Sequence, residues 1–111
     1  MQLSYINSKR TLVASIDGEI DHHSAARCRQ AIDSEFLKTK AQNIVFDFSK
    51  LHFMDSSGIG LIMGRYKLLA PVGGKVLLAG VSPQLDRLIS ISGIYKIVGW
   101  AKDVTEALAK L

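Results

Sequence analysis

Two adjacent serines, Ser56 and Ser57, stand at the predicted start of a helix, where their hydroxyls could take part in chemistry. Asp55 precedes them and Gly58 follows, between an apolar run typical of a strand and a periodic helical segment. The first backbone N–H groups of a helix lack partners within it, so this position suits a capping side chain and equally suits a phosphate. On spacing alone, Asp55 caps the helix and the serines fill its first turn. In the functional alternative a serine accepts a phosphate, whose charge a helix N-terminus favours by roughly 0.3–1 kcal/mol.

Two glycines, Gly58 and Gly60, fall within the first turns of the same predicted helix. Each costs about 1 kcal/mol relative to alanine in a helix interior. Two glycines in one turn therefore indicate that something other than helix stability requires them. A bare backbone surface against which a second protein lies would be one, and close packing of the helix against a strand would be the other.

A second polar cluster, Asp21-His22-His23, stands at the predicted start of an earlier helix. Adjacent histidines project from different sides of a helix, so they do not form the i, i+4 pair of a zinc site. Only Cys28 and His52 could add a further cysteine or histidine ligand. We therefore expect no metal site, and we expect Asp21 to cap the helix.

Enzymatic alternatives have weaker support. A hydrolase triad needs one serine, one histidine and one aspartate, and the candidates are Ser56 or Ser57, His22 or His23, and Asp21 or Asp47. The G-x-S-x-G nucleophile elbow is absent. The segment Gly73-Gly74-Lys75 lacks the spacing of a phosphate-binding P-loop. We therefore expect a protein that is not an enzyme, with any nucleotide for serine phosphorylation held by another protein.

The composition is that of one globular domain spanning residues 1–111, with 48% hydrophobic and 22% charged residues. Basic residues such as Lys9, Arg29 and Arg65 are scattered, so the net charge of +4 predicts a solvated surface and no nucleic-acid partner. No apolar run has the roughly 20 residues that span a bilayer, and the N-terminus resembles no signal peptide. With a single cysteine, the chain is expected to be cytoplasmic.

Strand and helix patterns alternate along the chain. Strands are predicted over 3–7, 11–17, 43–48, 75–80 and 94–98, and helices over 22–38, over 56–69, from Pro83, and over 104–111. The first two strands form a hairpin, and strands joined through helices form parallel pairs with right-handed crossovers. We therefore predict an α/β fold, a mixed sheet of four to five strands flanked by about four helices. Tyr95 and Trp100 are expected in the partial core.

The segment from Phe53 to Lys67, which contains Asp-Ser-Ser-Gly, resembles the motif of the anti-sigma factor antagonists, which are small bacterial STAS domains. The segment 18–23, with Asp-His-His, is similar to the first strand-to-helix junction of that family. Further similar segments, Gly73-Gly74, Ser82-Pro83 and 92–97, follow in the expected order, so the resemblance covers roughly residues 12–98. Ile59 replaces the usual leucine.

The resemblance implies a single STAS domain that acts as an anti-anti-sigma factor of the sporulation type. Its unphosphorylated form would bind a dual anti-sigma factor and serine kinase, releasing a sigma factor of the sigma F type. The kinase would phosphorylate Ser56 with its own ATP, and a metal-dependent PP2C-type serine phosphatase would reverse this. Contact with the partner is implied for Asp21, His22, Asp55, Ser57, Gly58 and Gly60.

Two alternatives remain within the same family. One is the general-stress type of antagonist. The combination of Asp-Ser-Ser-Gly with Asp-His-His favours the sporulation type over it only weakly. The other is a STAS domain that binds a nucleotide or another small molecule, for which no phosphate-cradling motif is present. No spare apolar helix face demands a dimer, so we expect a monomer.

Overall fold

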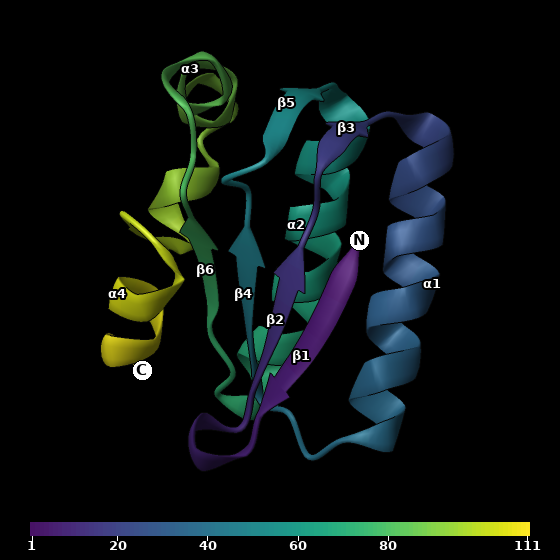
Figure 1. Ribbon diagram of the computed structural model, residues 1–111, viewed down its shortest axis with the longest axis vertical. Coiled ribbons are helices and arrows are strands. Elements are labelled where there is room, and N and C mark those ends of the chain that lie inside the picture. Colours follow the sequence, from purple (N-terminus) through teal and green to yellow (C-terminus); the bar gives the residue numbers. More distant parts are fainter.

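A five-stranded mixed sheet forms the centre of the computed structural model, which describes residues 1–111 (Figure 1). The strands lie in the order β1-β2-β4-β6-β7. Their bounds are Gln2–Ile6 for β1, Thr11–Ser15 for β2, Asn43–Asp47 for β4, Val76–Ala79 for β6 and Gly99–Ala101 for β7. Only β1 is antiparallel to its neighbour, while β2, β4, β6 and β7 are mutually parallel. The predicted α/β class, the opening hairpin and the mixed sheet are confirmed.

Four helices follow the strands, each started by a capping side chain. They are α1 (His22–Lys38), α2 (Ser56–Leu69), α3 (Pro83–Ser92) and α4 (Val104–Ala109), with the N-caps Asp21, Asp55, Ser82 and Asp103. Each cap side chain accepts a hydrogen bond from a backbone N–H of the first turn, which confirms the predicted helix starts. No helix combines the length and the apolar character that crossing a membrane would require.

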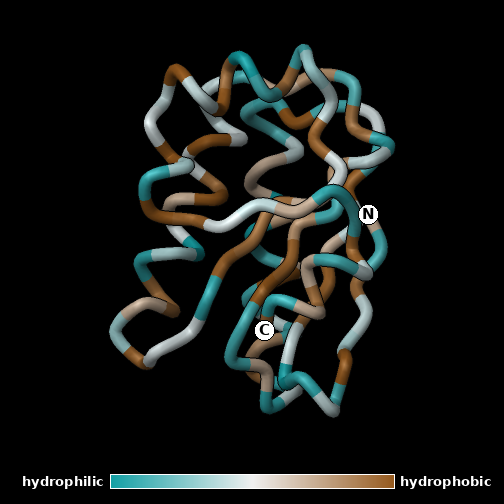
Figure 2. The backbone as a smooth tube through the Cα atoms, turned by 90° about the vertical axis from the view of Figure 1, so that its left-hand side faces the viewer, coloured by the Kyte–Doolittle hydropathy of each residue, from teal (hydrophilic) through white to brown (hydrophobic).

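Alternation along the strands divides the apolar side chains between the two faces of the sheet. Leu12, Ile44, Phe46 and Leu78 face the main core, where they meet apolar residues of α1, α2 and α3. The intervening residues, such as Val45, face a smaller cluster that α4 covers. The tube in Figure 2 shows hydrophobic segments gathered on the central strands. The central strands β2, β4 and β6 are thus buried on both faces, whereas the edge strands β1 and β7 are partly exposed.

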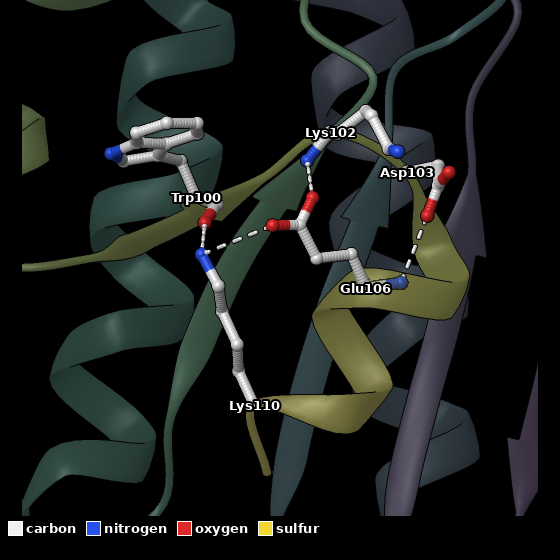
Figure 3. Close-up of polar contacts among 5 residues, drawn as sticks. All are labelled: Trp100, Lys102, Asp103, Glu106 and Lys110. Atoms are coloured by element: carbon white, nitrogen blue, oxygen red, sulfur yellow. Dashed lines mark hydrogen bonds and ion pairs between the residues drawn. The ribbon is translucent and has the colours of Figure 1, made fainter.

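The short helix α4 is attached to β7 by polar contacts (Figure 3). Lys110 Nζ donates to the Trp100 carbonyl at 2.6 Å and lies 5.0 Å from the centre of the indole ring. The Glu106 carboxylate accepts from the Lys102 N–H, and Asp103 accepts from the Glu106 N–H. Trp100 is 61% exposed, so its predicted place in the core is wrong. Its ring instead lies on the surface under the Lys110 ammonium.

A second, two-stranded parallel sheet lies at the carboxyl edge of the main one and was not predicted (Figure 1). It consists of β3 (Gly18–Ile20) and β5 (Leu51–Met54). Both strands are too short for a periodic signal, which explains why the sequence did not reveal them. They matter for function because β3 leads directly into Asp21 and β5 directly into Asp55.

The predicted strand over 94–98 is wrong. Residues Ile94–Lys96 form a 3-10 helix, and the last strand begins only at Gly99. Gly93 has a φ of +80°, which ends α3 and turns the chain. Ile94 and Val98 are buried while Lys96 between them is exposed, whereas a strand would place all three side chains on the same face. Two further 3-10 turns, Asn7–Lys9 and Ala70–Val72, follow β1 and α2.

Candidate functional site

The starts of α1 and α2 lie side by side at the carboxyl edge of the sheet (Figure 1). The paired strands β3 and β5 deliver the chain to both helices. The Asp55 N–H donates to the Ile20 carbonyl at 3.2 Å, which joins the two strand-to-helix junctions directly. The structure therefore brings together the two motifs, Asp-His-His and Asp-Ser-Ser-Gly, that lie more than thirty residues apart in the sequence.

Asp21 holds the first turn of α1 through a reciprocal pair of hydrogen bonds. Its Oδ1 accepts from the Ser24 N–H at 2.9 Å, and the Ser24 hydroxyl accepts from the Asp21 N–H at 2.9 Å. The bond from the Ser24 backbone, with smaller contributions from the Ser24 hydroxyl and from His23, holds the pKa of Asp21 below its ordinary value of 3.8. The capping role predicted for Asp21 is confirmed.

This cap gives the domain a defined pH dependence. A carboxylate whose pKa is lowered by folding stabilises the native state above its unfolded pKa, and this contribution is lost as the pH falls through the lower, folded pKa. Asp21→Ala should therefore reduce the free energy of unfolding at pH 7, and the gap between parent and variant should narrow as the pH falls below 3.8. Urea unfolding across this pH range measures the gap. A gap that stays constant over the range would contradict the prediction.

Ser56 and Ser57 have different surroundings. Asp55 Oδ1 accepts from the Ser57 N–H at 2.8 Å, so the side chain of Asp55 is committed to the cap. Ser56 occupies the first position of α2 and is exposed, and its hydroxyl makes no hydrogen bond within the protein. Ser57 is half-buried beside α1. Of the two hydroxyls, that of Ser56 is the more open to a reagent approaching from solution.

The two glycines at the start of α2 also differ. Gly58 is buried, and a Cβ there would overlap the Met54 side chain on β5, with the Met54 Sδ only 2.7 Å away. Close packing of α2 on β5 therefore explains why a glycine stands at position 58. Because Gly58 is buried, it is not part of the exposed surface that was predicted to contact a partner. A Cβ on Gly60 would meet nothing within 4 Å, and Gly60 is exposed. Only Gly60 presents bare backbone to the outside.

A groove of about 280 Å³ runs between α1 and α2 from these helix starts. His22, Ala25 and Arg29 line it from α1, and Ser57, Gly60 and Arg65 line it from α2. His22, Ser57 and Gly60 were predicted site residues, and here they share one surface. Asp21 and Asp55 do not line the groove, because their carboxylates cap the helices on either side.

The burial of Arg65 was not predicted from the sequence. Arg65 was expected on a solvated surface, yet it is only 6% exposed and forms an ion pair with Asp33 of α1, with Nε and Oδ1 3.2 Å apart. Leu61 and Leu69, both buried, stand one turn to either side of it on α2. This i, i+4, i+8 spacing is the signal that could have placed Arg65 on the inner side of the helix.

No hydrolase triad is assembled from the candidate residues. Asp21 is engaged by Ser24, and Asp47 accepts from the Ser15 hydroxyl and the Ser49 N–H, both at 3.1 Å. The rings of His22 and His23 contact each other edge to face, with centres 5.7 Å apart. The geometry joins neither serine to a histidine base.

Comparison with known families matches residues 3–107 to the STAS domain. The chain belongs to the STAS domain family. This STAS domain is 34% identical to an anti-sigma F factor antagonist from Paenibacillus polymyxa, over 100% of the chain and 95% of that relative. It is 33% identical to another from Lysinibacillus sphaericus, over 92% of the chain and 85% of the relative. An anti-sigma-B factor antagonist from Bacillus subtilis is 29% identical over 82% of each chain.

Solved structures agree with this assignment. The unphosphorylated form of the anti-sigma factor antagonist SpoIIAA superposes with a TM-score of 0.83 at 32% identity, covering 98% of this STAS domain and 93% of SpoIIAA. The phosphorylated form of SpoIIAA gives a TM-score of 0.75 at the same identity, over 98% and 96%. The family resemblance predicted from the motifs is thus confirmed, and so is the fold class that it implied.

Proposed function

We propose that this STAS domain is an anti-sigma factor antagonist of the SpoIIAA-like, sporulation type. The observation that supports it most is the exposed, unbonded hydroxyl of Ser56 at the start of α2, in a chain 34% identical to an anti-sigma F factor antagonist. SpoIIAA, a 32% identical relative, exists in both an unphosphorylated and a phosphorylated form. A hydroxyl in this position suits a reversible phosphorylation switch.

In the proposed mechanism, the unphosphorylated domain binds an anti-sigma F factor that is also a serine kinase, and thereby releases the sigma factor. The contact surface comprises the starts of α1 and α2 with Asp21, His22, Asp55, Ser57 and Gly60. The kinase, with ATP bound to itself, transfers a phosphoryl group to Ser56. A PP2C-type serine phosphatase removes it, so the domain acts as a substrate and binding partner and not as an enzyme.

The chemistry of a phosphoserine explains why one modification can act on the complex and spare the fold. It adds a charge of about −1.5 to −2 at pH 7 and three acceptor oxygens. At the exposed start of α2 the helix dipole tolerates this charge. Within a closed interface the same charge is stripped of water beside the Asp55 carboxylate, and it opposes binding.

Intact-mass measurement after incubation with ATP and the cognate anti-sigma F factor tests the proposal. We expect a gain of one phosphoryl group, mapped to the peptide that contains Ser56. Ser56→Ala should gain none, while the matched variant Ser57→Ala should still be modified. A phosphoryl group on Ser56→Ala would show that Ser56 is not the acceptor. Modification by an anti-sigma-B kinase in preference to the anti-sigma F factor would instead favour the general-stress type.

A further inference from the structure

The groove between α1 and α2 contains a buried positive charge that is only partly compensated. The Arg65 side chain is 7% exposed, and its one ionic partner is Asp33. The Arg65 Nε lies 3.2 Å from Asp33 Oδ1, yet its N–H does not point at that oxygen, so the pair is an ion pair without a hydrogen bond. Arg65 Nη1 has no hydrogen-bond partner at all. A buried donor left unpaired costs on the order of 1–3 kcal/mol. Because Nε and Nη1 are enclosed by the protein, an acceptor from a partner would approach the part of Arg65 that lines the groove.

A second guanidinium, that of Arg29, lines the same groove from α1. Burial lowers the pKa of Arg65, the Asp33 carboxylate raises it, and the Arg29 charge lowers it further. The two arginines therefore lie close enough to repel each other. No carboxylate lines the groove, and Asp33, the ionic partner of Arg65, lines the neighbouring apolar pocket instead. The groove carries an excess of positive charge.

The walls of the groove leave room for another protein. A Cβ on Gly60 or on Gly64 would meet nothing within 4 Å, so α2 offers bare backbone here. On the facing helix the lining residues between His22 and Arg29 are alanines. Small residues on both sides allow a partner segment to approach closely enough for its side chain to reach the arginines.

We propose that this groove receives a carboxylate side chain, Asp or Glu, of the anti-sigma F factor, which binds between Arg29 and Arg65. Two guanidinium groups and a carboxylate form charge-assisted hydrogen bonds, often in bidentate geometry. This inference rests on the proposed function, and it adds a contact beyond the helix starts. Arg65 stands eight positions after Ser57 on α2, about 12 Å along the helix. The arginines therefore lie farther along the groove than the two serines.

Binding of the anti-sigma F factor, measured by calorimetry without ATP so that no phosphate is transferred, tests the inference. Arg29→Glu should weaken binding about 10- to 100-fold, the effect of breaking one close charge pair and adding repulsion. Arg27→Glu is the matched control, because Arg27 is exposed on α1 outside the groove and undergoes the same change of charge. It should change the affinity less than about threefold. Reversal of one acidic residue of the partner to lysine should restore binding to Arg29→Glu.

Gly64→Met provides a second variant that leaves the charges intact. It fills the groove from α2 and removes a helix-breaking glycine, so the domain should fold while binding weakens. If Arg29→Glu and Gly64→Met bind like the parent while Ser56→Asp does not, the groove inference is wrong and the proposed function stands. If the parent itself does not bind the anti-sigma F factor, the proposed function fails, and this inference fails with it.

Discussion

Ser56→Asp is expected to weaken binding of the anti-sigma F factor by about a thousandfold, while the domain stays folded. A thousandfold loss of affinity corresponds to about 4 kcal/mol. Burying one unpaired carboxylate in an interface costs several kcal/mol, so a single negative charge can supply this amount. Asp55 stands directly before Ser56, and its own carboxylate is already committed to the Ser57 N–H, so it cannot move away to relieve the repulsion.

The native fold, in contrast, should tolerate the same charge. Ser56 is exposed and its hydroxyl forms no bond that the substitution would break. The start of α2 carries the positive end of the helix dipole, and no acidic residue lies within its first turn. The free energy of unfolding should therefore stay within about 0.5 kcal/mol of the parent value.

Calorimetry against the anti-sigma F factor measures the affinity, and urea unfolding followed by circular dichroism measures the stability. Ser4→Asp is a suitable control, because Ser4 is exposed on β1 and receives the same charge away from the helix starts. It should bind like the parent. A Ser56→Asp variant that keeps full affinity would contradict the switch mechanism, whereas loss of the circular dichroism spectrum would contradict the claim that the fold tolerates the charge.

Local signals of the sequence predicted much of what positions this site. The caps at Asp21, Asp55 and Ser82 were predicted because a cap depends only on residues two or three positions away. The buried strands β4 and β6 were predicted from short continuous apolar runs. These elements determine where the chain emerges at the carboxyl edge of the sheet.

What the sequence did not reveal depends on contacts between distant segments. β3 and β5 are strands only because they pair with each other. Arg65 is buried because α1 supplies both cover and the Asp33 carboxylate. The two short strands have no local signal. The spacing of Arg65 between Leu61 and Leu69 is a local signal, but it competes with the ordinary expectation that an arginine is solvated. Ser56 was selected by the family resemblance, and the groove beside it emerges only from the packing of two helices.

The same substitution, glycine to valine, can be made at Gly58 and at Gly60. At Gly58 it tests the packing of the fold, and at Gly60 it tests binding of the partner. Gly58→Val should lower the free energy of unfolding by about 3 kcal/mol, because the new side chain has to displace Met54 from a close-packed position. Gly60→Val meets open space, so stability should stay within about 0.5 kcal/mol of the parent value. Its side chain instead projects from the wall of the groove, and binding of the anti-sigma F factor should weaken.

A double-mutant cycle makes the cause at Gly58 specific. If contact with Met54 is responsible, Met54→Ala should remove part of the penalty of Gly58→Val, giving a coupling energy of about 1 kcal/mol or more. The same cycle between Met54 and Gly60 should give no coupling, because nothing lies within 4 Å of a Cβ at Gly60. Equal losses of stability at the two glycines would show that helix propensity, and not packing on β5, governs both positions. Gly58 would then return to the candidates for direct contact with the partner.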